Sequence, residues 1–466
     1  MTQRSPNPAA HHVRHLDHTS SRSRVIGLVS LLLLGACVAD GVGSPATASQ
    51  VTIPEANGPD ITPADLRLAI GPLVPRAMLP AGWPGQFEGK LDAAINRLVS
   101  EVASGSYSHI TDSGDADNPH YGPLRMVVMR NIRAGLPLDE SEPGFAAALK
   151  ITREFIRRYA IPNGNRVSLY RNTNVIDTEI VYWLYKDQPD DNGLLAEQCR
   201  QFIQVASAWL SNNLTPAQEN LDHHWMDTRT IALAIDAALS AQRVGWDFHA
   251  RGAASYNRYA QSQYMPAGVT SWETWIEYVN GFIDRMQAAT MERFGGQTDP
   301  NGFAILPGNI RYGQSGDWRC QLQPCQAYRE PYPFKPFMDA MTANALLRAW
   351  HQHASDASKQ NAIEMATGIH QHYDVRRRTL PYSSHGTSAA RYFYANPTDF
   401  VLNNYWVRPL LEMYGITGEI WMRDVAIGLL QQSLNADWTW RFKQSQQLAS
   451  ATEPQSAQAL LAGVRY

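Results

Sequence analysis

Residues 220–243 read NLDHHWMDTRTIALAIDAALSAQR, and this stretch decides the fold that we expect. Its second half is rich in alanine and aliphatic residues, and it predicts a helix over Trp225–Arg243. Its first half is polar, and Asn220 or Asp222 would accept a free backbone N–H at the start of that helix. Ionisable residues therefore lead directly into an apolar helix.

A helical period recurs on both sides of this stretch. Gly89–Ala103, for example, carries Leu91, Ile95, Leu98 and Val99 at spacings of three and four residues, which is typical of an amphipathic helix. Apart from short pieces such as Gly302–Leu306 and Val167–Tyr170, no alternating strand pattern is present, so we expect an all-α protein. The other predicted helices are Phe145–Tyr159, Val175–Tyr185, Leu194–Asn212, Ser271–Phe294, Phe334–His353, Lys359–Tyr373, Phe400–Tyr414 and Glu419–Leu434.

The connections between these helices alternate between short and long. Gly415–Gly418 is a predicted tight hairpin, whereas residues 295–332 form a long predicted loop. Long loops inside compact domains are usually functional. Paired helices with the long loops at one end are typical of an α/α toroid, here an incomplete or six-hairpin barrel. Its inner helices would surround a cleft, and loop residues such as Trp318 would form the rim.

Two segments resemble the alginate-lyase-like members of the α/α-toroid carbohydrate-active enzymes, over roughly residues 170–375. Residues 220–225 (Asn-Leu-Asp-His-His-Trp) are similar to the Asn-Asn-His motif that opens an alanine-rich inner helix in that family. Residues 299–303 (Asp-Pro-Asn-Gly-Phe), followed by Tyr332, are similar to its Asp-Gly-Phe segment and the tyrosine after it. The resemblance implies a polysaccharide lyase. This chain departs from the motif by having Leu221 and Asp222 where the family has its second asparagine.

The polar half of the first stretch combines two imidazoles with a carboxylate. His223 and His224 fall in the first turn of the predicted helix, and Asp227 lies four and three residues later on the same face. A carboxylate in that position fixes a histidine tautomer and raises the basicity of the ring. The alternative is a capped helix whose histidines are partly buried and satisfied by neighbours.

β-Elimination on a uronic acid polymer requires a neutralised substrate carboxylate, a base for the adjacent proton and an acid for the leaving oxygen. His224 would act as base or neutralising group, and Tyr332 as acid or base. Arg329 or Lys335 would bind the carboxylate. Asn220 and Trp225 would contact the sugar beside them.

The anionic Asp222 would repel a substrate carboxylate, and it favours the alternative of a glycoside hydrolase in the same cleft. Such an enzyme needs two carboxyl groups on either side of the scissile bond. Candidates at helix starts or in loops are Asp177, Asp222, Asp227, Asp317, Glu330 and Asp339. Asp177 and Asp339 could instead stabilise the first turns of their helices.

Two further clusters are candidate glycan subsites. Arg376–Arg378 with Tyr382, Ser384 and His385 forms a basic aromatic loop that suits an acidic glycan, and its alternative is a solvated helix end. The second cluster has amide, aromatic and cationic groups at a helix start, and its alternative is capping plus core packing. It consists of Asn403, Asn404, Tyr405, Trp406 and Arg408.

The first residues predict export. Residues 1–24 are polar and basic, and an apolar run of about a dozen residues follows, shorter than the roughly 20 that span a membrane. Residues 34–37 (Leu-Gly-Ala-Cys) resemble the lipobox of bacterial lipoproteins, which implies lipid attachment at Cys37. Val38 favours the periplasmic face of the outer membrane or the cell surface. The alternative is an ordinary signal peptide cut near Ala46–Ala48.

The expected organisation is a lipoprotein signal peptide over 1–36 and a tether over 37–85. An α/α-toroid domain over 86–440 and a C-terminal tail over 441–466 follow. Outside the cytoplasm, Cys320 and Cys325 predict a local disulfide, with a metal site as the alternative. Cys199 is a predicted buried thiol.

The net charge is −3, from 40 basic and 43 acidic residues, and nothing in the sequence indicates a nucleic-acid binder, which would show a basic stripe. The 13 tryptophans and 20 tyrosines suit stacking on sugar rings. The sequence has no phosphate-binding loop, nucleophile elbow or zinc helix, and we expect neither cofactor nor metal. We expect a monomeric enzyme that degrades or modifies a polysaccharide. The alternative class is a non-catalytic envelope lipoprotein that binds glycan or a partner protein.

Overall fold

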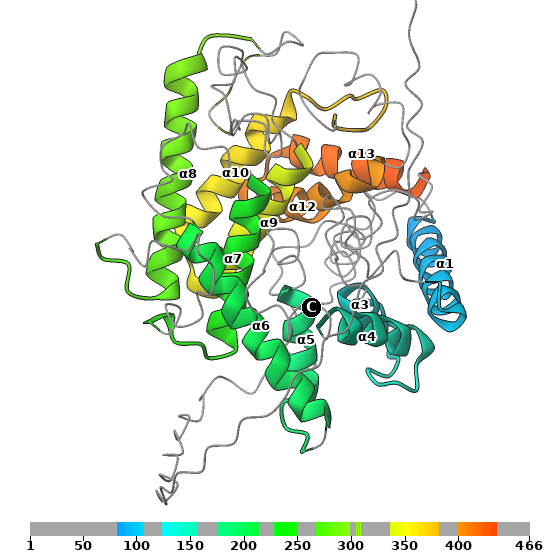
Figure 1. Cartoon of the computed structure of the whole chain (residues 1–466). Helices are drawn as coiled ribbons and strands as arrows, with labels where there is room; N and C mark the ends of the chain where they lie inside the picture. The colour runs from blue at the N-terminus through cyan, green and yellow to red at the C-terminus, as the bar shows by residue number, and fades with distance from the viewer. Residues whose placement is uncertain are drawn as a thin grey trace, which may run out of the picture. The chain divides into compact units, whose positions relative to one another are not determined.

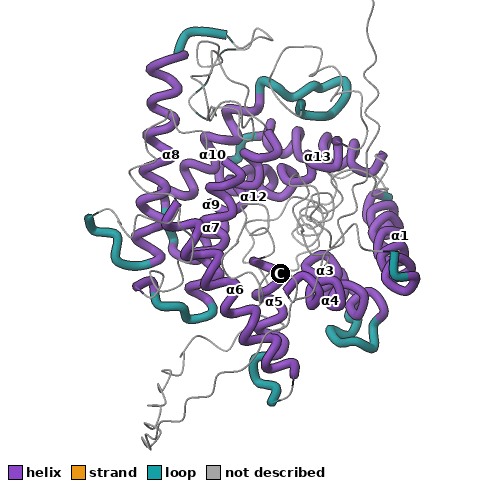
Figure 2. The backbone as a smooth tube through the Cα atoms, viewed as in Figure 1, coloured by secondary structure: helices purple, strands orange, loops and turns teal. Residues whose placement is uncertain are grey.

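The computed structural model describes residues 82–106, 124–156, 175–189, 191–213, 228–249, 267–298, 304, 306, 308, 336–381 and 399–435. All of them belong to one compact unit, Glu55–Tyr466. Within these ranges the chain is helical, and two isolated β-bridges are its only extended pairings (Figure 2). The prediction of an all-α protein is therefore confirmed. None of the described helices is both long and apolar enough to cross a membrane.

The helices follow one another along the chain without an intervening strand in the described ranges (Figure 1). They are α1 (Trp83–Ser104), α3 (Leu124–Ala134), α4 (Pro143–Phe155), α5 (Val175–Tyr185), α6 (Asp191–Asn213), α7 (Thr228–Arg243), α8 (Trp272–Phe294), α9 (Pro336–His353), α10 (Asp356–His370), the 3₁₀ helix η8 (Asp399–Trp406), α12 (Val407–Thr417) and α13 (Ile420–Asn435).

Local signals explain several helix ends. Ser271 caps α8, where its side chain accepts from the backbone N–H of Thr274 at 3.1 Å and the Thr274 hydroxyl accepts in return from Ser271, a capping box. Gly418 ends α12 with a φ of 75°, a left-handed conformation that glycine adopts without steric cost. The predicted hairpin at 415–418 is therefore wrong in extent, because the helix runs through Thr417 and the turn consists of Gly418 and Glu419.

Several helix predictions differ from the structure, and α10, at Asp356–His370, lies three residues earlier than predicted. α1 begins at Trp83 rather than Gly89, because Pro84 is tolerated in a first helical turn. α3 was not predicted at all. The single predicted helix over 400–414 is a 3₁₀ helix followed by an α-helix. Pro409 accounts for this break, since proline lacks an N–H and its ring clashes with the carbonyl four residues earlier, that of Tyr405.

α7 and α9 are parallel neighbours. Thr228 contacts Asp339, Asp236 contacts Arg348 and Gln242 contacts Gln352, and the paired residues are separated by 111, 112 and 110 positions. A nearly constant separation along two helices means that they run in the same direction and in register. The Asp236–Arg348 pair is bidentate, with N···O distances of 2.8 and 2.7 Å.

α9 is also parallel to the segment formed by η8 and α12. Asn344 donates to the carbonyl of Tyr405 at 2.7 Å, and His351 contacts Glu412, both at a separation of 61 positions. The Tyr405 carbonyl is the one that Pro409 deprives of its helical donor, so an α9 side chain replaces the missing bond. The change from the 3₁₀ helix η8 to α12 is therefore stabilised by the packing of α9 against it.

The parallel helices differ from their neighbours in burial. In α9 every residue from Pro336 to Leu347 is buried, the first part of α12 is buried as well, and in α7 every residue described between Thr228 and Ala241 is buried except the partly buried Asp236. A helix that is enclosed all round belongs to an interior layer. The helices α8, α10 and α13 instead keep an exposed side. Connections of two residues join α9 to α10 and α12 to α13, which makes each pair antiparallel.

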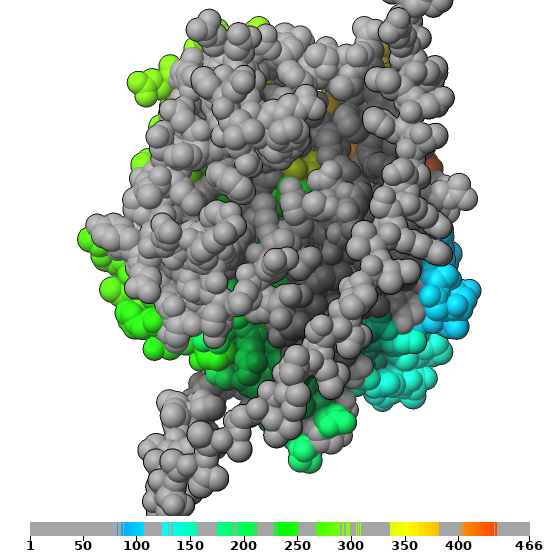
Figure 3. All heavy atoms as spheres, viewed as in Figure 1, coloured from blue at the N-terminus to red at the C-terminus, as the bar shows by residue number. Residues whose placement is uncertain are grey.

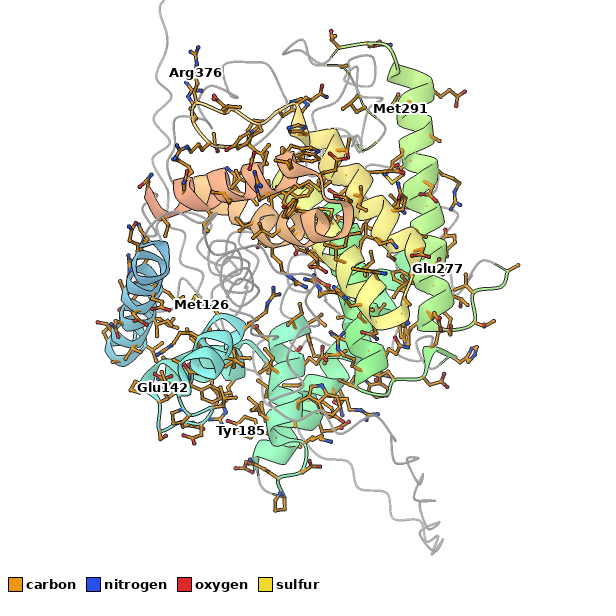
Figure 4. The ribbon with its side chains drawn as sticks, turned by 180° about the vertical axis from the view of Figure 1, so that it is seen from behind. Met126, Glu142, Tyr185, Glu277, Met291 and Arg376 are labelled. Atoms are coloured by element: carbon orange, nitrogen blue, oxygen red, sulfur yellow. The ribbon has the colours of Figure 1, made fainter. Side chains whose placement is uncertain are left out.

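Neighbouring helices form a closed circuit of contacts. α1 contacts α4, α4 contacts α5, and α5, α7, α9, α12 and α13 follow in turn, until α13 contacts α1 again. The atoms of α1 form part of the surface visible in Figure 3. In α4, which contacts α1, the carboxylate of Glu142 (Figure 4) caps the start of the helix. The same carboxylate accepts a hydrogen bond from the side-chain amide of Asn131 on α3 at 3.0 Å. One hydrophobic cluster includes buried residues of all these helices.

Candidate functional site

The first residue of α7 is hydrogen-bonded to the first turn of α9. Thr228 is buried, and its hydroxyl donates to a carboxylate oxygen of Asp339 at 2.8 Å. The hydroxyl of Thr342 donates in turn to the backbone carbonyl of Thr228 at 2.5 Å. Two bonds between the same short segments fix the position of one helix start relative to the other.

The end of η8 joins the same place. The indole N–H of Trp406 donates to the carbonyl of Pro336, the first residue of α9, at 2.7 Å. We call the residues Thr228, Pro336, Asp339 and Trp406 the helix-start junction. Its side chains and backbone groups come from three parallel segments, so the polypeptide that enters each of these helices arrives at the junction.

Charged groups are enclosed at this junction. Asp339 is completely buried and Arg229, directly after Thr228, is almost completely buried. Burial of charges is costly unless they are compensated, and Arg229 and Asp339 each take part in a further interaction. The junction is therefore a polar centre inside an apolar helical layer.

Most of the predicted site residues precede these helix starts along the chain and lie outside the described residues. Asp227 is the residue before Thr228, and Lys335 is the residue before Pro336. Residues of the prediction outside the described ranges are Asn220, His223, His224, Trp225, Asp227, Trp318, Arg329, Tyr332 and Lys335, together with Cys37, Cys320 and Cys325.

The predicted subsite on η8 lies within the described ranges. Asn403 is buried, and its amide donates to the hydroxyl of Thr379 at 2.6 Å. Tyr405 is buried as well, and Asn404 occupies the same 3₁₀ helix. A glycan would thus reach Asn403 and Tyr405 only through the residues that cover them. The hydrogen bond of Asn403 connects the segment around Thr379 to η8, which is a structural role.

Two of the six candidate carboxylates are described, and both are enclosed. Asp339 belongs to the junction. Asp177 lies in the first turn of α5, as expected, and one of its oxygens accepts from the backbone N–H of Arg125 at 3.1 Å. Its other oxygen has no hydrogen-bond partner. Burial raises the pKa of Asp177 to about 7, against the opposing effects of the charge and the backbone bond of Arg125.

Further ionic pairs hold the buried helices together. Arg243 at the end of α7 binds both oxygens of Glu179 on α5, at 2.6 and 2.7 Å. Glu412 on α12 contacts His351 on α9 and lies 3.5 Å from the guanidinium of Arg408. These groups are bonded to one another inside the helical layer, which assigns them a structural task.

The sequence reasoning missed a cavity between the end of α10 and α13. It encloses about 730 Å³ and is lined by His370, Tyr373, Val375, Arg378, Trp421, Arg423, Asp424, Val425, Ile427, Gly428 and Gln431. Of these, only Arg378 belonged to a predicted subsite. A glycine inside an otherwise helical pattern, here Gly428, is the one local signal that could have drawn attention to the cavity.

The described residues contain no group of three or more His, Cys, Asp or Glu side chains that could hold a metal ion. Cys199 is fully buried, as predicted. No family model, curated protein or solved structure matches this chain. Its function is therefore inferred from its own residues.

Proposed function

We propose that this protein is an exported α/α-toroid enzyme that cleaves a uronic-acid-containing polysaccharide by β-elimination, in a site formed by the segments that lead into the helix-start junction. The observation that carries the proposal is the hydrogen bond between Thr228 and Asp339. It joins the two helix starts that the predicted catalytic segments enter.

Chain length limits how far the predicted groups lie from the junction. His224 precedes Thr228 by four positions, and Tyr332 precedes Pro336 by four. An extended chain spans about 3.5 Å per residue, so each Cα lies within roughly 14 Å of its helix start. This limit is compatible with a shared site for the two side chains.

In the proposed reaction His224 removes the proton on the carbon beside the substrate carboxylate. The electron pair of that C–H bond forms a carbon–carbon double bond, the bond to the glycosidic oxygen breaks, and Tyr332 donates a proton to that oxygen. Arg329 or Lys335 neutralises the carboxylate and stabilises the negative charge that develops on it. The products are a shortened chain and an unsaturated sugar, so no water is consumed.

The toroid is supported by three features of the described helices. α7, α9 and α12 follow one another as parallel neighbours, and each is buried over most of its length. Short connections pair α9 and α12 with antiparallel helices that have an exposed side. The contacts between neighbouring helices close into a circuit. Each feature is expected of helical hairpins arranged around an axis.

The hydrolase alternative is weakened by the burial of Asp177 and Asp339. A glycosidase needs carboxyl groups on either side of a bound sugar, and neither of these side chains has a surface that a sugar could reach. The remaining carboxylate candidates are Asp222, Asp227, Asp317 and Glu330, which lie outside the described residues.

The reaction is tested by incubating the mature protein with a panel of polyuronates and recording ultraviolet absorbance, since elimination creates an unsaturated product. We expect His224→Ala and Tyr332→Phe each to reduce the rate by about 100-fold or more, with unchanged unfolding behaviour. His249→Ala, at an exposed position after α7, is the matched control and should retain full activity. Reducing ends without new absorbance would instead indicate hydrolysis, and full activity of both site variants would refute the assignment.

Export and lipid attachment belong to the same proposal. Cys37 would carry the lipid after removal of residues 1–36, and two or more acyl chains would hold the protein on a membrane stably. Labelled palmitate should enter the wild-type protein and not Cys37→Ser, and the variant should leave the membrane fraction. Labelling that is equal in the two proteins would exclude this anchor.

A further inference from the structure

The cavity between α10 and α13 has an aromatic platform on one side. The rings of His370 and Trp421 are stacked, with centroids 4.0 Å apart and planes inclined by 13°. Trp421 packs against the hydrophobic core, whereas His370 is exposed. Partial burial of the ring nevertheless lowers the pKa of His370 from its ordinary value, which favours the uncharged ring at neutral pH. A flat, uncharged aromatic surface suits the apolar face of a sugar ring.

A short hairpin supplies a cation to the same cavity. Asp374 pairs with Thr379 across the hairpin, and its carboxylate accepts the backbone N–H groups of Arg376 and Arg377 at 2.9 and 3.0 Å. Arg378 has a φ of 53°, a left-handed conformation that is sterically unfavourable for a residue with a Cβ atom. Strain of this kind persists where the surrounding bonds enforce it, and it often marks a functional position.

The strained backbone directs Arg378 into the cavity. Its guanidinium donates to the amide oxygen of Gln431 on α13, which is uncharged. Among the described residues no carboxylate lies within ion-pair distance of Arg378, whereas the neighbouring Asp424 is paired with Arg423 at 2.6 Å. Arg376 points away from the helices (Figure 4). Arg378 therefore supplies an uncompensated positive charge to the cavity wall.

α13 also contributes a glycine to the wall of the cavity. A Cβ atom at position 428 would lie 1.8 Å from the hydroxyl of Tyr373 and 3.6 Å from the Cβ of Arg378. Glycine is less favourable than alanine inside a helix, and here it makes room for the phenol. Burial raises the pKa of Tyr373 to about 12, so its hydroxyl remains a neutral hydrogen-bond donor.

We propose that this cavity is a second binding site, and that it takes an acidic sugar unit of a glycan chain. The ring would stack on the His370–Trp421 pair, and its carboxylate would bind Arg378. A volume of about 730 Å³ is in the range of small-molecule sites. The class of ligand rests on the proposed function, but the site does not require the protein to be catalytic.

The competing occupant is an anionic lipid surface, because Val375 is 76% exposed and Ile420 58% exposed near the arginines. A concave cavity with a stacked pair and one directed cation favours the sugar. A flat lipid surface would use the exposed Arg376 at least as much as Arg378, since attraction to such a surface depends on net charge close to it. The two arginines of one hairpin therefore provide a matched comparison.

The test is calorimetric titration of His224→Ala protein with uronate tetrasaccharides, namely galacturonate, mannuronate and guluronate, and with their carboxyl-reduced forms. We expect at least one acidic tetrasaccharide to bind and its reduced form to bind at least 10-fold more weakly. Adding Arg378→Gln or Trp421→Ala should weaken binding about 10-fold, and Gly428→Ala should weaken it by displacing Tyr373. Arg376→Gln should change the affinity less than 2-fold.

Three outcomes would overturn this proposal. They are no binding by any tetrasaccharide, equal binding of the reduced forms, and equal effects of Arg376→Gln and Arg378→Gln. Co-sedimentation with phosphatidylglycerol vesicles that depends on both arginines, without an effect on sugar binding, would assign the cavity to lipid instead. Since binding is measured in a variant that lacks His224, failure of the eliminase activity does not alter this readout.

Discussion

The hydroxyl of Thr228 donates to Asp339 at 2.8 Å and thereby joins the first residues of two parallel helices. Both groups are buried, so the bond is not exchanged for one with water. Hydrogen bonds to a buried carboxylate are stronger than neutral ones. A site assembled from the polypeptide before α7 and before α9 would be positioned by this contact.

Replacing Thr228 with valine should therefore destabilise the protein. Valine keeps the shape and removes the donor, which leaves a buried carboxylate oxygen without that bond and costs about 1–3 kcal/mol. Urea unfolding measures the loss, and Thr228→Ser, which retains the hydroxyl, should lose clearly less. Equal unfolding midpoints for the valine variant and the wild type would show that the bond does not hold the junction.

The stability of the protein should depend on the protonation of Asp177. The pKa of this carboxyl is raised from 3.8 to about 7 by burial, so between these values the folded state binds the proton and the unfolded state does not. The contribution is present in full below about pH 4, and it decreases as the pH rises to about 7. A tenfold difference in proton affinity corresponds to about 1.4 kcal/mol, so the total is on the order of 4 kcal/mol.

The Asp177→Asn variant lacks this titrating group, so it is the reference with which the wild type is compared. The difference in unfolding free energy between wild type and variant, measured at several pH values, should shift by several kcal/mol against the wild type between pH 4 and pH 7. Parallel pH profiles of the two proteins would mean that Asp177 is ionised at neutral pH in the folded state.

The cysteines give a test that separates burial from disulfide formation. Burial raises the pKa of the Cys199 thiol well above its ordinary value, and only the thiolate reacts readily with Ellman's reagent. A Cys37→Ser protein should therefore show no reactive thiol when folded and one in urea, because Cys320 and Cys325 are predicted to be bonded. Three thiols should appear after reduction. Detection of three reactive thiols in urea without prior reduction of the protein would exclude the disulfide.

The helices were predictable from sequence wherever a local signal and a periodic apolar pattern coincide. α5 has the predicted limits, and α8 begins directly after its predicted first residue, Ser271, because serine caps it. α3 lacks such help. It is short, it follows a loop rich in Ser, Gly and Asp, and it carries three arginines among its apolar residues. Its helical state depends on packing against α4 and α5.

The candidate sites show a sharper limit. Sequence reasoning selected ionisable residues at helix starts, and the junction of α7, α9 and η8 brings those starts together. It could not find the stacking of His370 on Trp421, since the two residues are 51 positions apart (421 − 370) and neither stands in a motif. It also treated Asn403 as a ligand group, whereas the tertiary structure gives its amide a partner in Thr379.

The buried pair of Arg408 and Glu412 offers a last prediction, because its two groups are incompletely satisfied. Arg408 is 1% exposed and Glu412 is fully buried. Their closest charged atoms are 3.5 Å apart, and no nitrogen of the guanidinium has a hydrogen-bond partner. The attraction between two enclosed charges offsets their desolvation only when the geometry is good. We infer that the pair contributes little net stability although each member depends on the other.

Removing one member should therefore cost much more than removing both. Glu412→Gln leaves the buried guanidinium of Arg408 without its carboxylate and should lower the unfolding free energy by about 3–5 kcal/mol. Arg408→Met leaves Glu412 with His351 as its remaining contact and should lower the unfolding free energy as well. The double variant Arg408→Met with Glu412→Leu should recover most of this loss, since both cavities are filled by apolar groups. Urea unfolding of all four proteins forms a double-mutant cycle. Additive losses in the double variant would show that the two charges do not interact, despite their position one helical turn apart on α12.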